Sequence, residues 1–409
     1  MRAQVLCAAV LAAGLLPSKA GAQLLPLTES EVLARLSPDS PRVRAIRAAI
    51  EVVRADVLSA ARWPNPRVTF DRESVAGISE NMTMVSQALP INGYRRLQVQ
   101  AAGALVDAIS SRVDDQLRRA RADLRLAFTD LVAAQVRERE LARARDRLRD
   151  LADVLAKREA AGDAAGFDRL RAEREVLDLE ADRAVAATER ARAQGAVAGF
   201  FADRTDAARI VAVEASAARP ALPRVEALVE QAESIRGELI AFRKEIDAAN
   251  FSERAAERRR IPDPEIVAGT KSSTLGGGDV GSVVTIHAVV PLFDRARPER
   301  ALARAKAAQA EARAAAFRVT LRSEITALRA AVLERREAAD RYRSAAVAGA
   351  DQIERIAQVS YDAGERGILE LLDAYRTGAS ARVRQAALDA ATRQAEIELE
   401  FLSGWELPS

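Results

Sequence analysis

Few residues of this 409-residue chain could do chemistry, and none is arranged as in an enzyme. Glu370 and Asp373 are two carboxylates three residues apart, and their spacing alone favours a solvated helix face. Asp168 and Arg366 are opposite charges that, if exposed, would contribute under about 1 kcal/mol to stability as a pair. The chain has no glycine-rich phosphate loop, catalytic-triad spacing or paired-histidine motif, so we expect neither enzyme activity nor a cofactor.

Ligands for a soft metal ion are nearly absent. His287 is the only histidine and Cys7 the only cysteine, and Met82 and Met84 are the only methionines after the first residue. Metals such as zinc and copper are held by several imidazole or sulfur ligands. We therefore expect that this protein holds no metal ion of its own.

The first 22 residues have the layout of a secretory signal peptide. A basic start at Arg2 is followed by an apolar stretch and by small residues up to Ala22, so we expect cleavage near Ala22 and export through the inner membrane. Cys7 lies inside the apolar stretch rather than after a cleavage site, which argues against a lipid anchor. No later window approaches the ~20 apolar residues of a membrane-spanning helix.

Positive and negative charges are balanced in this chain. Lys and Arg number 62 and Asp and Glu number 59, which leaves a net charge of +3. Opposite charges alternate along the helical stretches, as is typical of solvated helix faces. Aromatic residues make up only 4% of the chain, which is few for a protein that stacks bases. We therefore expect no binding of nucleic acid.

The elements that must position the charged residues occur twice. Pro64 recurs as Pro262, Pro90 as Pro291 and Gly162 as Gly364, at offsets of 198, 201 and 202 residues. Three landmarks in the same order at a nearly constant offset indicate a duplicated unit. The predicted divisions are a signal peptide at 1–22, a first repeat at 23–209 and a second repeat at 210–409.

Each repeat is expected to contain a long helical hairpin. Proline is absent between Pro90 and Pro220, and apolar residues recur there at helical or heptad spacing. A helix of roughly 70 residues would be about 100 Å long, whereas globular helices average roughly 12 residues. This length indicates a coiled coil or a helical barrel. The predicted hairpins span 92–200 and 294–403, and shorter helices are predicted at 41–62 and 224–260.

A pair of short strands is expected before each hairpin. Alternate residues from Val284 to Val290 are all apolar and the residues between them are mixed, as in a strand with one lipid-facing or buried side. Four strands cannot close a barrel with a lumen, yet backbone groups that face lipid must all be paired. Three chains would supply twelve strands. The predicted strands lie at about 67–75, 82–89, 265–271 and 283–290.

Two motifs carry a resemblance to a known family. Ala61-Arg62-Trp63-Pro64-Asn65-Pro66 enters the first strand, and Tyr361-Asp362-Ala363-Gly364-Glu365-Arg366-Gly367-Ile368-Leu369-Glu370-Leu371-Leu372-Asp373-Ala374 surrounds the second glycine turn. With the proline exits of the strands, these motifs resemble the outer membrane factor family, the TolC-like outer membrane efflux proteins, over nearly all of the mature chain. The second motif is most similar to the CzcC-like heavy-metal efflux branch.

The resemblance implies a mainly α fold with a small β part. Three copies would form an α-helical barrel in the periplasm and a twelve-stranded β-barrel in the outer membrane, with four strands per chain. The protein would be the exit duct of a tripartite efflux system for heavy-metal cations, with passive transport and gating at the helical tips. Its partners would be a periplasmic adaptor, an inner-membrane pump of the RND type and outer-membrane lipid.

The resemblance also assigns residues to the tips. The adaptor would dock on Gly162, Asp163, Gly166, Gly364, Glu365 and Gly367. The gate would consist of Tyr361, Arg366, Glu370, Asp373 and Asp168, with Arg366 bonded to Asp168. Carboxylates repeated around a narrow pore attract cations. One departure is that the arginine that partners the tyrosine in the family falls on Asp389.

Other functions share part of this pattern. A drug-efflux duct or a type I secretion duct would keep the fold and change the cargo. A periplasmic coiled-coil adaptor would share the export signal and a long hairpin. Adaptors, however, carry one hairpin flanked by compact β domains, whereas this chain has two hairpins and few strands.

Overall fold

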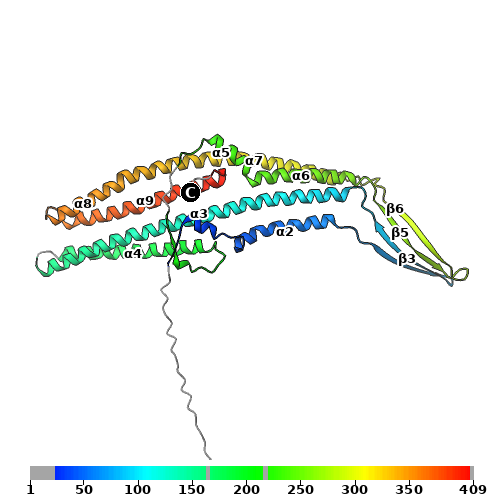
Figure 1. The fold of residues 1–409 in the computed structure, drawn as a ribbon, viewed down its shortest axis with the longest axis horizontal. Coiled ribbons are helices and arrows are strands. Elements are labelled where there is room, and N and C mark those ends of the chain that lie inside the picture. Colours follow the sequence, from blue (N-terminus) through cyan, green and yellow to red (C-terminus); the bar gives the residue numbers. More distant parts are fainter. Residues whose placement is uncertain (1–23, 163–165, 215–219, 406–409) are drawn as a thin grey trace, which may run out of the picture.

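The molecule is long and narrow, with helices along most of its length and a sheet at one end (Figure 1). The computed structural model describes residues 24–162, 166–214 and 220–405, so the predicted signal peptide and Asp163 lie outside the described residues. Both helical tips lie at the end opposite to the sheet. The expected fold class, mainly α with a small β part, is confirmed.

A capped helix precedes the long strands of the first repeat. Helix α2 (Pro41–Ala61) starts at Ser40, whose hydroxyl accepts a 3.3 Å hydrogen bond from the Val43 N–H. After the strands, Gly93 at φ +80° precedes helix α3, which runs for 67 residues, about 100 Å. The remaining elements are β2 (Arg67–Val75), β3 (Ile78–Ala88), α3 (Tyr94–Ala160) and α4 (Gly166–Ala198).

Strand β3 begins at Ile78, earlier than the predicted residue 82. Ala76 and Gly77 have φ values of +46° and +84°, as in a two-residue hairpin turn, so the strands remain paired up to Val75 and Ile78. Alanine is not a residue that favours positive φ, and the sequence therefore did not reveal this turn.

The second repeat has the same order of elements. Helices α5 (Val225–Ile235) and α6 (Gly237–Arg258) precede strands β5 (Pro264–Ser273) and β6 (Val280–Ala288). The hairpin then consists of α7 (Arg297–Tyr342), a π-helical turn (Arg343–Val347), α8 (Ala348–Asp362) and the returning helix α9 (Ile368–Ser403).

Two helices of the second repeat are interrupted where the sequence predicted continuity. The single helix predicted over 224–260 is wrong, because the chain bends at Arg236, where φ is −64° and ψ is 115°. Close packing explains this bend. A Cβ on Gly237 would overlap the carbonyl oxygen of Ser111 on α3, and Arg236 Nε lies 3.3 Å from Asp115 Oδ2. The other interruption is the π-helical turn between α7 and α8.

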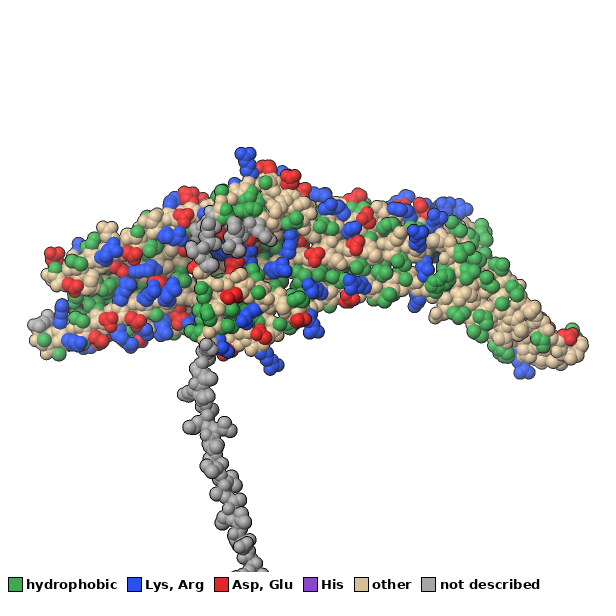
Figure 2. All heavy atoms as spheres, in the orientation of Figure 1, with side chains coloured by type: hydrophobic (Ala, Val, Ile, Leu, Met, Phe, Trp, Pro, Cys, Tyr) green, Lys and Arg blue, Asp and Glu red, His purple; other side chains and the backbone are tan. Residues whose placement is uncertain are grey.

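The four long strands form one antiparallel sheet in the order β2-β3-β5-β6. The register aligns Val68, Val85, Ala268 and Val284 in one row across all four strands. The opposite face is mixed and carries a 2.7 Å ion pair between Lys271 and Glu80. Figure 2 shows that hydrophobic and uncharged side chains cover most of the sheet surface in view. The face of Val68 and Val284 is the more apolar of the two, and we call it the apolar face, although Arg72, Asn81 and Gln87 also lie on it.

The helices pack in two rows, one on each side of the middle of the molecule. Near the sheet, α2 contacts α3, α3 contacts α6 and α6 contacts α7. Near the tips, α4 contacts α3, α3 contacts α9 and α9 contacts α8. Each row therefore has two outer helices, one from each repeat. They are α2 and α7 near the sheet, and α4 and α8 near the tips.

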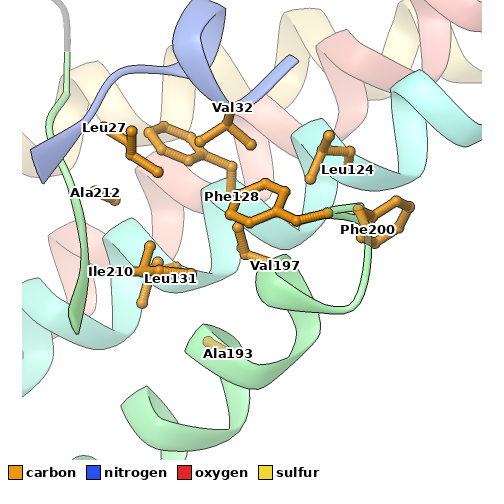
Figure 3. Packing of buried hydrophobic residues seen from close by; sticks show 11 residues of the cluster. Leu27, Val32, Leu124, Phe128, Leu131, Ala193, Val197, Phe200, Ile210 and Ala212 are labelled. Atoms are coloured by element: carbon orange, nitrogen blue, oxygen red, sulfur yellow. The ribbon is translucent and has the colours of Figure 1, made fainter. Parts of the chain in front are cut away.

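A hydrophobic cluster at mid-length joins the N-terminal segment to the first hairpin (Figure 3). Strand β1 (Leu25–Leu27) pairs in parallel with β4 (Ile210–Ala212), which follows the short turn Ala207–Arg209, and helix α1 (Glu29–Ala34) packs beside them. Leu124, Phe128 and Leu131 of α3 fill the space below. Within the described ranges, no helix has the length and apolar character needed to cross a membrane.

Candidate functional site

The two tips have similar turn geometry. In the second tip, Gly364 at φ +75° donates to the Tyr361 carbonyl at 3.0 Å, and Glu365 N–H donates to the Ser360 carbonyl at 2.8 Å. This pattern is the Schellman motif, which needs a residue in the left-handed region. In the first tip, Gly162 at φ +83° donates to the Glu159 carbonyl at 2.9 Å. Both glycines predicted at the tips therefore end a helix in a tight turn.

The other tip residues within the described ranges lie in the turn or at the start of a helix. Gly367 precedes α9 in extended conformation, and Glu365 is exposed. Gly166 begins α4 and lies so close to Glu159 that a Cβ there would overlap its carboxylate. The same carboxylate is 2.5 Å from Arg169 Nε. This contact braces the first tip.

A shared apolar cluster holds the two tips side by side. Leu148, Leu151 and Leu155 of α3 are buried against Leu371 and Leu372 of α9. Ala172 and Val176 of α4 and Ala357 of α8 belong to the same cluster. All four helices of the two hairpins therefore meet just behind the tips.

Tyr361 is half-buried at the edge of this cluster. Its ring lies 5.7 Å from the guanidinium carbon of Arg158, which belongs to the first hairpin. A cation over an aromatic face is attracted by the ring quadrupole. Arg158 is thus a contact between the tips that the sequence did not reveal, because nothing in its spacing separates it from the other arginines of α3.

Glu370 and Asp373 are exposed on one side of α9, while Leu371 and Leu372 are buried on the other. Within the described chain, neither carboxylate forms an ion pair. Their position leaves both charges free to face a neighbouring copy or an open space.

The predicted pair between Asp168 and Arg366 is not formed within one chain. In the part of the chain that the structure describes, neither side chain makes a hydrogen bond or ion pair, so the pair stays a prediction for an assembly. Asp389 lies instead beside the π-helical turn, with Oδ1 2.5 Å from Arg343 Nη2. It is 21 residues along α9 from Ile368, or about 30 Å, too far to bond the tyrosine.

An ionic cluster around the buried carboxylate of Glu354 joins the hairpins farther from the tips. Glu354 of α8 accepts a 2.7 Å hydrogen bond from Arg147 of α3 and bonds of 2.7 and 2.8 Å from Arg382 of α9. We call these three residues the ionic clasp. Gly378 of α9 makes room for it, since a Cβ there would overlap Glu354 Oε1. One feature of the sequence could have indicated this clasp, namely that Gly378 lies in the middle of a predicted helix.

The described residues offer no ready metal site or large cavity at the tips. Within the described ranges, no three His, Cys, Asp or Glu side chains converge on a common point. A cavity of about 130 Å³ lies near the sheet, between α3, α6 and α7, and is lined by Tyr94, Arg259, Glu299 and Lys306 among others. It does not adjoin the tips.

The fold is that of the channel subunits of bacterial outer membranes. It matches the Campylobacter jejuni CmeC outer membrane channel with a TM-score of 0.75 and 13% identity, over 93% of this chain and 87% of that one. It matches the outer membrane protein VceC of Vibrio cholerae with a TM-score of 0.72 and 16% identity, over 93% and 97% of the two chains.

The model of the outer membrane efflux protein family matches residues 228–405, and the predicted resemblance to this family is thereby confirmed. Among curated relatives, the chain is 22% identical over 382 residues to the cobalt-zinc-cadmium resistance protein CzcC of Cupriavidus metallidurans. That alignment covers 93% of this chain and 90% of the relative.

Proposed function

We propose that this chain is one of three identical subunits of an outer-membrane exit duct in a tripartite efflux system. The observation that carries the proposal is a set of free edges. Strands β2 and β6 are the outer strands of the sheet, and α2 with α7 and α4 with α8 are the outer helices of the two rows. In the sheet and in each row of helices, one of the two outer elements comes from each repeat.

Such edges suit a closed ring of copies. A head-to-tail contact joins two different surfaces of the chain. It closes into a ring when a whole number of copies completes one full turn. Three copies would pair each β2 with the β6 of a neighbour and give twelve strands. Closure also satisfies the unpaired backbone groups of the outer strands, which lipid does not tolerate.

The outer helices near the tips carry exposed apolar side chains that fit this contact. On α4, Phe167, Leu170 and Leu177 are exposed, and on α8, Ile353, Ile356 and Val359 are exposed at spacings of three residues. Large apolar stripes on a helix surface mark sites of association. The ring would bury these two stripes against each other.

The apolar face of the sheet fits contact with lipid. Val284 is 74% exposed and shares this face with Val68, and Phe70 and Ile286 are exposed on it as well. A barrel strand alternates an apolar outer face with a polar inner one. The sheet would therefore lie in the outer membrane and the helices in the periplasm.

Transport would be passive, with energy supplied by an inner-membrane pump of the RND type through a periplasmic adaptor docked on the tips. The gate would lie at Tyr361, Arg366, Glu370, Asp373 and Asp168. Support for heavy-metal cations as cargo comes from the name of the curated relative and from the exposed acidic pair of α9.

Fractionation tests the assembly. We expect the mature protein in the detergent-extracted outer membrane as a trimer that dissociates on heating. Recovery as a soluble periplasmic species would contradict the proposal and favour an adaptor. Deletion of the gene should lower tolerance to cobalt, zinc or cadmium, and a change only in drug tolerance or protein secretion would reassign the cargo.

A further inference from the structure

The junction between the sheet and the helices is rich in arginine. Residues 61–67, 92–97, 257–265 and 292–300 contain ten arginines and five carboxylates, a net charge of +5. The whole chain carries only +3, so the rest of it is net −2. Eight arginines of these segments are exposed, and one of them, Arg259, pairs with Glu299 at 2.5 Å. The other seven form what we call the arginine collar: Arg62, Arg67, Arg96, Arg258, Arg260, Arg295 and Arg297.

The collar arginines have no ionic partners in the part of the chain that the structure describes. Arginines elsewhere are often paired, as Arg336 is with Glu396 at 2.7 Å. Two nearby carboxylates are engaged by the backbone instead. Asp263 Oδ1 accepts from the Asn92 N–H at 3.1 Å, and Asp294 Oδ1 from the Ala296 N–H at 3.0 Å. Within the described residues, no ion pair therefore compensates the positive charge of the collar.

Exposed apolar side chains lie in the same segments as the collar. Phe293 is 98% exposed and Trp63 is 53% exposed. Ile91 and Leu292, which are close to these segments or within them, are exposed as well. Arg95 stacks on the Trp63 ring at 4.9 Å. Figure 2 shows Lys and Arg side chains where the helical part meets the sheet, next to the hydrophobic surface of the sheet. Aromatic and basic side chains together are typical of the level of lipid headgroups.

Ring closure would concentrate this charge further. Arg62 follows the outer helix α2 and Arg67 begins the outer strand β2, while Arg295 lies between the outer elements β6 and α7 and Arg297 begins α7. In the proposed ring, these pairs from neighbouring copies would lie near each other. Like charges held close repel, so an anionic partner would stabilise the junction.

We infer that the arginine collar binds the phosphate groups of anionic phospholipids in the periplasm-facing leaflet of the outer membrane. The inference rests on the proposed trimeric duct. Basic residues beside a membrane are attracted by anionic headgroups within about one Debye length, ~8 Å at physiological salt. The collar fixes the depth at which the sheet enters the membrane and holds the edges of neighbouring copies together.

The test uses the purified full-length trimer in mixed micelles that contain either dimyristoylphosphatidylglycerol or dimyristoylphosphatidylcholine. The readout is the temperature at which the trimer dissociates. We expect the anionic phosphatidylglycerol to raise this temperature more than the zwitterionic phosphatidylcholine. High salt should remove most of this difference between the two lipids. The variant Arg258→Gln/Arg260→Gln/Arg295→Gln/Arg297→Gln should lose most of the difference.

The matched control removes four exposed arginines outside the collar, in Arg171→Gln/Arg192→Gln/Arg318→Gln/Arg322→Gln, and should keep the difference. Equal dissociation temperatures in the two lipids, or a collar variant that keeps the full difference, would overturn the inference. So would an equal rise with inorganic phosphate alone, because the site would then take a soluble anion. A collar variant that still conducts ions would leave the proposed duct intact.

Discussion

Arg147 of the first hairpin and Glu354 of the second form an ion pair of 2.7 Å. Glu354 is ten residues from the tip glycine Gly364, or about 15 Å along the helix. The Glu354 carboxylate also binds Arg382, so one buried group connects α3, α8 and α9. This clasp sets the position of the second hairpin against the first without using any tip residue.

Gly378→Ala should loosen the ionic clasp while keeping all of its charges. The new methyl group would occupy the place of Glu354 Oε1, and the flexible carboxylate would have to move away from Arg147 and Arg382. We expect a larger conductance in planar bilayers and greater sensitivity of cells to large antibiotics. Gly349→Ala is the matched control, because no atom lies within 4 Å of its Cβ position. Identical conductance in both variants would show that the clasp does not restrict the current through the channel.

Replacement of Glu370 and Asp373 by alanine should reduce cation preference. Both carboxylates are exposed on one side of α9 and would repeat around the pore of a trimer. We expect the reversal potential in a salt gradient to move toward zero. Glu51→Ala/Asp56→Ala removes the same charge from the exposed surface of α2 and should leave the reversal potential unchanged. An unchanged cation preference in the first variant would contradict the assignment.

Gly237→Ala and Gly103→Ala should have opposite effects on stability. A Cβ at 237 would overlap a backbone oxygen, that of Ser111, and overpacking of this kind costs about 1–3 kcal/mol. A Cβ at 103 meets nothing within 4 Å, and alanine is favoured over glycine inside a helix by up to about 1 kcal/mol. Thermal unfolding of the two purified variants measures the difference. Equal midpoints would show that α6 does not pack on α3 this closely.

Arginine should be tolerated on one face of strand β6 and not on the other. Val284 lies on the apolar face and Thr285 on the mixed face, because successive side chains of a strand alternate. An arginine facing lipid near the middle of the membrane costs about 2–4 kcal/mol. The yield of heat-sensitive trimer should therefore fall for Val284→Arg and stay near normal for Thr285→Arg. Similar yields would mean that the apolar face does not meet lipid.

The sequence predicted the order of elements because proline, glycine and apolar spacing act locally. Gly162 and Gly364 end their helices as expected, and β2 occupies its predicted range. The bend at Arg236 was missed because it depends on contact between α6 and Ser111, far away in the chain. Long-range packing of this kind leaves little trace in local composition.

The same distinction applies to the site. The glycine turns could be predicted, but the contact of Arg158 with Tyr361 and the ionic clasp could not, because they join helices from different repeats. An arginine-rich sequence contains many arginines that could form an ion pair with each carboxylate. Only the packing of α3 beside α8 and α9 selects among them.

Recordings in planar bilayers decide whether this protein is an exit duct. The ion conductance of the purified full-length wild type and of Gly378→Ala is measured side by side. If the protein is an exit duct, we expect discrete, cation-selective current steps. These steps should be small in the wild type and larger in Gly378→Ala, in which the clasp is loosened. Bilayers that stay silent with both proteins, when each is recovered as a folded trimer, would contradict the account.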